Sequence, residues 1–127
     1  MLFDEHRKQW EELIRDTLEL PEKMKTQEEN IHRRQQIVEQ YQNILRDSEG
    51  EMVLSGVPGK NQAERDAHIC ACTKETRDAL RQAEKDLALA RIDRDFLVNK
   101  FKANRVVLLA LRPAITSSAE TGEEIVR

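Results

Sequence analysis

The chain has one cluster that combines histidine and cysteine metal ligands, which consists of His68, Cys70 and Cys72. On a helix, His68 and Cys72 share one face because they are four residues apart, whereas Cys70 points elsewhere. A structural zinc site normally needs four ligands, usually arranged as two pairs. His6 and His32 are not placed to supply the second pair. The sequence therefore predicts no metal site and no cofactor. The cysteines are interpreted as small, buried apolar side chains in a reducing, intracellular setting.

No pattern of catalytic residues is present. The chain lacks a glycine-rich phosphate loop, a zinc-protease helix motif and a nucleophile elbow. Its many carboxylates alternate with Lys and Arg at helical spacing, as in Glu75, Arg77, Asp78 and Arg81, which is typical of a solvated helix surface. We therefore expect no catalytic residues and no enzymatic activity.

A basic stretch over residues 91–112 suggests phosphate binding as an alternative. Six basic residues against two acidic ones give this stretch a charge of +4, although the whole chain carries −3. No aromatic platform for base stacking is interleaved with it. The candidate nucleic-acid contacts are Arg91, Arg94, Lys100, Lys102 and Arg105.

The elements that position these residues are predicted from an apolar repeat. Every seventh residue from Phe3 to Met52, except Thr17, is apolar, in a chain that is only 39% hydrophobic and 35% charged. A sustained seven-residue repeat predicts a long helix that packs along a seam, here over residues 2–49, with Pro21 as its only interior breaker. The predicted class is all-α and coiled-coil-like.

A turn and a second helix follow. Three glycines and a proline predict a turn over residues 50–60. Asn61 and Glu64 have the spacing of a capping box, and an apolar stripe from Ile69 to Leu111 predicts an unbroken helix over 61–112, ending before Pro113. Residues 1–112 then form one domain, and 113–127 a flexible tail.

Two helices of similar length joined by a short turn are expected to fold into an antiparallel hairpin. Charge favours this pairing, because residues 1–20 carry −3 and would face the basic 91–112 stretch. Val106–Leu111 is apolar around the whole helix, and Ile92, Phe96 and Val98 lie off the stripe, so a second copy is expected to cover them. The predicted packing seam comprises Trp10, Ile14, Val38, Leu45, Leu87, Leu97, Phe101, Leu108 and Leu111.

The turn motif Pro58-Gly59-Lys60-Asn61-x-x-x-Arg65 resembles that of small uncharacterised helical-hairpin proteins of bacteriophages and prophages. The resemblance covers Val53 to about Leu111 and implies a viral or mobile-element setting, with no catalytic residues.

Together these patterns predict a homo-oligomeric coiled-coil protein, a dimer or higher, that acts by binding another macromolecule. Its expected partners are a second copy and an unidentified protein, and nucleic acid is the alternative. The sequence contains no membrane-spanning segment and no signal peptide, so a cytoplasmic protein is expected, in the host cell if phage-encoded.

Overall fold

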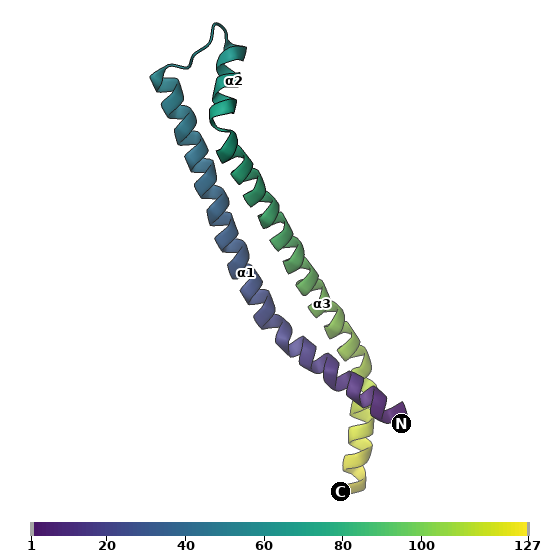
Figure 1. Ribbon diagram of the computed structural model, residues 1–127. Coiled ribbons are helices and arrows are strands. Elements are labelled where there is room, and N and C mark those ends of the chain that lie inside the picture. The colour runs from purple at the N-terminus through teal and green to yellow at the C-terminus, as the bar shows by residue number, and fades with distance from the viewer. Residues whose placement is uncertain (1, 127) are drawn as a thin grey trace. The chain divides into compact units, whose positions relative to one another are not determined.

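The computed structural model describes residues 2–126, with side chains described for residues 4–111. It consists of three helices: α1 (Leu2–Ser55), α2 (Gln62–Cys72) and α3 (Lys74–Val126) (Figure 1). No strand occurs among the described residues, so the prediction of an all-α protein is confirmed. Within the same part of the chain, no helix is both long and apolar enough to cross a membrane.

The first helix continues through Pro21 and ends later than expected. Pro21 lies inside α1 with an exposed side chain, so it does not divide the helix. The helix also passes Gly50, where glycine costs only about 1 kcal/mol relative to alanine. It ends at Ser55, whose hydroxyl donates to the Glu51 carbonyl at 2.6 Å, and Gly56 follows with a φ of +85°. Gly56 thus provides the left-handed residue that commonly terminates a helix.

The cap predicted at Asn61 is confirmed. The Asn61 side chain accepts a hydrogen bond from the Glu64 backbone N–H at 2.9 Å. The Glu64 carboxylate in turn accepts from the Lys60 N–H at 2.7 Å, one residue before the position of a standard capping box. Gly59 is needed beside this cap, because its φ is +151° and a Cβ there would lie 2.9 Å from the Arg65 backbone nitrogen.

The second predicted helix is interrupted at Thr73, which separates α2 from α3. Thr73 is only 2% exposed, and both its backbone N–H (3.0 Å) and its hydroxyl (2.7 Å) donate to the Ile69 carbonyl. A threonine hydroxyl that bonds back to the carbonyl four residues earlier bends a helix. The backbone at Thr73, with φ −102° and ψ 8°, departs accordingly from helical geometry.

At its other end, α3 extends beyond the expected boundary at Arg112. The helix continues past Pro113 to Val126, in the region where the sequence predicts a flexible tail. Proline removes one backbone hydrogen bond from a helix interior, which weakens the helix there but leaves its other bonds in place. The side chains of residues 112–127 lie outside the described ones.

The chain divides into two units, which we describe separately. The loop-proximal unit comprises residues 28–92 and the terminal unit comprises residues 1–27 and 93–127. The core of the loop-proximal unit lies between α1 and α3, which run antiparallel to each other within this unit (Figure 1). It consists of Ile31, Val38, Ala83, Leu87 and Ala90, flanked by Tyr41 and Leu80.

In the terminal unit the most buried of the described side chains is Leu20, which is 1% exposed and lies outside the seven-residue repeat. The repeat positions Trp10, Thr17 and Met24 are half-buried. Thr17, the polar member of the first stripe, donates its hydroxyl to the Leu13 carbonyl at 2.7 Å. A threonine can therefore occupy this half-buried position without leaving its hydroxyl unpaired.

Candidate protein interface

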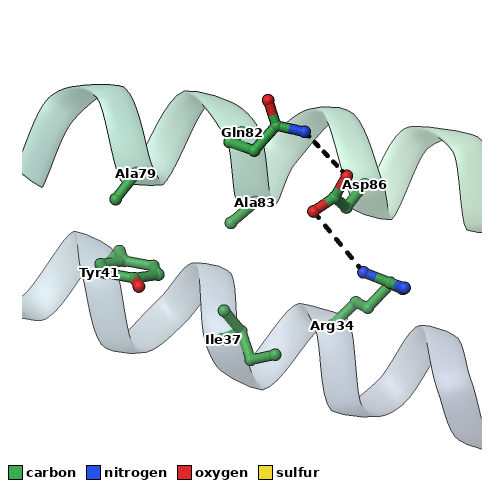
Figure 2. A pocket seen from close by; sticks show the side chains of 7 residues that line it. All are labelled: Arg34, Ile37, Tyr41, Ala79, Gln82, Ala83 and Asp86. Atoms are coloured by element: carbon green, nitrogen blue, oxygen red, sulfur yellow. Dashed lines mark hydrogen bonds and ion pairs between the residues drawn. The ribbon is translucent and has the colours of Figure 1, made fainter.

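The loop-proximal unit has a surface groove where α1 and α3 run side by side. Figure 2 shows Ile37 and Tyr41 of α1 beside Ala79 and Ala83 of α3, with Arg34 of α1 directed toward Asp86. Gln82 and Asp86 complete the lining of this depression of about 310 Å³. It exists because two alanines stand where larger side chains would fill the space between the helices. The groove was not predicted, although the pair of alanines four residues apart is a sequence signal for it.

An ion pair crosses the groove. Arg34 Nη1 lies 3.7 Å from Asp86 Oδ2, and the Gln82 side-chain amide donates to the other oxygen of Asp86 at 3.0 Å (Figure 2). Both charged side chains are more than one-third exposed, so this pair contributes little stability, about 0–1 kcal/mol. Arg34 Nε is buried and has no hydrogen-bond partner among the described residues.

A second ion pair lies nearer the turn. Arg77 Nη2 donates to Glu49 Oε1 at 2.5 Å, while Arg77 Nε donates to the Thr73 hydroxyl at 2.9 Å. Arg77 therefore connects the end of α1 to the residue that separates α2 from α3. This network fixes the geometry of the helix pair at that point, although both charged side chains remain partly exposed.

The residues of the predicted packing seam occupy three environments. Val38 and Leu87 are buried in the core of the loop-proximal unit. Leu111 is 44% exposed. The others are half-buried: Trp10, Ile14, Leu45, Leu97, Phe101 and Leu108.

Most of the predicted nucleic-acid contacts are exposed. Arg91, Lys100, Lys102 and Arg105 make no ion pair or hydrogen bond with the side chains that the structure describes. Arg94 differs, because it is half-buried and its Nε donates to Asp95 at 3.2 Å. The structure therefore leaves four of the five basic side chains accessible to solvent.

Apolar side chains are exposed near the end of the described part of α3. This exposed patch comprises Phe96, Val106, Val107, Leu109 and Leu111, with exposed fractions of 44–65%. Leu108, in the middle of the same run, is half-buried. Within Val106–Leu111, Leu108 is thus the half-buried position and the other positions are exposed to solvent.

Among the described residues, no three side chains of His, Cys, Asp or Glu lie close enough together to hold a metal ion. Comparisons with protein-family models, curated proteins and solved structures give no match for this chain.

Proposed function

We propose that this protein is a non-enzymatic, oligomeric coiled-coil protein that acts by binding another macromolecule, as an accessory factor in a phage or prophage setting. In this proposal residues 1–112 form one antiparallel helical hairpin, and a second copy is its first partner. The observation that carries the proposal is the exposed patch on α3.

The geometry of a helix explains why this patch needs a partner. Successive residues are rotated by about 100°, so the six apolar residues Val106–Leu111 surround the helix completely. One neighbouring helix can cover only one side, and Val106 remains 65% exposed. A second copy would bring two such patches together and bury both.

The energy available from the patch predicts a reversible assembly. Full burial of one large apolar side chain is worth about 1.5–3 kcal/mol, so completing the burial of a half-exposed one yields about 1 kcal/mol. The five side chains of the patch on each of two copies yield about 10 kcal/mol, against an association cost of about 4–15 kcal/mol. At the lower end of that cost the net free energy is about −6 kcal/mol, which corresponds to a dissociation constant between about 1 μM and 1 mM. We therefore expect oligomers that dissociate on dilution through the upper micromolar range.

Light scattering coupled to size-exclusion chromatography, over a series of protein concentrations, tests this proposal. The informative variant is Val106→Glu, and the matched control is Val53→Glu, because both valines are 65% exposed but Val53 lies outside the patch. We expect the mass of the wild type and of V53E to rise with concentration, while V106E stays monomeric. A wild type that remains monomeric throughout, or a V106E variant that assembles like the wild type, would refute the proposal.

A second candidate function is phosphate binding through Arg91, Lys100, Lys102 and Arg105. Their exposure and lack of ion-pair partners among the described side chains favour it. If all four contacted phosphates of duplex DNA, the logarithm of the binding constant would fall with the logarithm of salt concentration with a slope of about −3.6, four times the usual −0.9 per contact. A gel-shift titration at low salt tests this alternative, and the absence of any shift would exclude it.

A further inference from the structure

Helix α2 carries two potential metal ligands in direct proximity. Cys72 Sγ and His68 Nε2 are hydrogen-bonded at 3.5 Å. Both side chains are exposed, so the prediction of buried cysteines is wrong. Cys70 is also exposed, but it lies two residues from Cys72, on a different side of the helix. The sulfur and the imidazole nitrogen are therefore paired on one face, with a second thiol nearby that does not share it.

The separation of these two atoms suits one metal ion. A tetrahedral zinc ion has Zn–S distances of about 2.3 Å and Zn–N distances of about 2.1 Å. At the tetrahedral angle, these bond lengths place sulfur and nitrogen about 3.6 Å apart. The observed 3.5 Å is close to this value, so a metal ion could bind both atoms with little movement of either side chain.

Space for the remaining ligands is available beside His68. This residue borders an open groove of about 390 Å³, which it shares with Glu51 and Met52 of α1. Since no third metal-binding side chain is close enough among the described residues, water would occupy the other positions. Such a site would bind metal more weakly than a four-ligand structural zinc site.

A bound metal ion is expected to affect the stability of helix α2. It is 11 residues long and has no buried residue. Isolated helices of this length are marginal in water, because packing usually supplies most of a helix's stability. A metal ion joining residues four apart would hold one helical turn closed, and binding would therefore favour the folded state of α2.

We propose that His68 and Cys72 chelate one divalent transition-metal ion, best matched by Zn²⁺, and that the bound ion stabilises α2. Neutral His68 binds through Nε2 with its proton on Nδ1, while the Cys72 thiol releases its proton to solvent and binds as thiolate. The metal keeps its oxidation state. This proposal is independent of the proposed oligomeric function.

The first test is a titration with Co²⁺, which reports a thiolate ligand through its charge-transfer absorption, followed by displacement with Zn²⁺. A phosphine reductant keeps both thiols reduced. We expect Cys72→Ser to lose the charge-transfer band and His68→Gln to lower the metal affinity at least tenfold. Replacing even a residue that only contacts a metal ligand typically lowers metal affinity by about 10–100-fold, so the loss of a ligand should cost at least as much. Cys70→Ser is the matched control and should bind like the wild type. Equal binding by C72S and wild type, or an equal loss in C70S, would overturn the proposal.

Hydrogen exchange provides a second readout. Zn²⁺ should slow amide exchange over residues 62–72 in the wild type and in C70S, and leave exchange in C72S unchanged. All three substitutions are at exposed positions, so they remove no core contact. Zinc binding without slower exchange in this segment would refute the stabilising role.

Discussion

Replacing Leu87 with alanine tests whether the core between α1 and α3 stabilises the loop-proximal unit. Leu87 is 8% exposed, and the substitution removes three carbon atoms from the core. At about 0.8 kcal/mol for each buried methylene-sized group, the transfer term is slightly above 2 kcal/mol. The cavity left behind adds to it, so we expect L87A to lower the free energy of unfolding by about 2–3 kcal/mol.

Leu89→Ala is the matched control, since it makes the same chemical change two residues away on the same helix. Leu89 is 59% exposed, so its loss should cost about 1 kcal/mol or less. Urea unfolding followed by circular dichroism measures both variants. With a denaturant slope of about 2 kcal/mol/M, L87A should lower the urea midpoint by about 1 M and L89A by less than half of that.

The comparison should be made at two protein concentrations tenfold apart, because self-association would stabilise the folded chain. If L89A destabilises the protein as much as L87A at the lower concentration, then the assignment of Leu87 to the core and of Leu89 to the surface is wrong.

Three further substitutions probe the helix ends and the interior of α1. Asn61→Ala removes the cap of α2 and should lower the stability of this helix by about 1 kcal/mol. Amide exchange over residues 62–72 should then be roughly fivefold faster, and unchanged exchange would show that the cap does not stabilise the helix. Glu49→Gln breaks a partly exposed ion pair with Arg77 and should lower the free energy of unfolding in urea by at most about 1 kcal/mol. The difference from wild type should shrink in high salt, and a salt-independent difference would contradict an electrostatic origin. Pro21→Ala should raise the melting temperature, because proline inside a helix is about 3 kcal/mol less favourable than alanine; a lower melting temperature would mean that Pro21 has a packing role.

The apolar spacing was sufficient to predict an all-α chain and the core positions of the loop-proximal unit. Ile31 and Val38 on the first stripe, and Ala83 and Leu87 on the second, lie in the core of the loop-proximal unit. A period of three and four residues determines which side of a helix is apolar, and that side must be buried whatever its partner is. The core positions of this unit therefore follow from the spacing.

The break at Thr73 could not be predicted from the same pattern, because Thr73 keeps the phase of the second stripe. At the break between α2 and α3, the Thr73 hydroxyl donates a hydrogen bond to the Ile69 carbonyl. Thr17 makes the equivalent bond to Leu13, yet α1 continues there. The outcome thus depends on the surroundings of each threonine, among them the bond from Arg77 to the Thr73 hydroxyl, which a linear pattern does not contain.

The candidate sites were predictable to different degrees. The exposed patch on α3 follows from a run of apolar residues longer than one helical turn. The match between the His68–Cys72 separation and a metal's ligand distances requires side-chain coordinates, since four-residue spacing places two side chains on one face without fixing the distance between their atoms. Sequence reasoning excluded a metal here because it required a second ligand pair.

The Glu49–Arg77 ion pair has a consequence for the alignment of the two helices. A regular seven-residue apolar repeat looks nearly the same after one helix slides past the other by seven residues, so apolar contacts alone define the alignment poorly. Such a slide would place Glu49 opposite either Glu84 or Cys70 instead of Arg77. One alternative sets two negative charges against each other, and the other leaves Glu49 without its cation. The ion pair thus contributes little to stability and selects one register among otherwise similar ones.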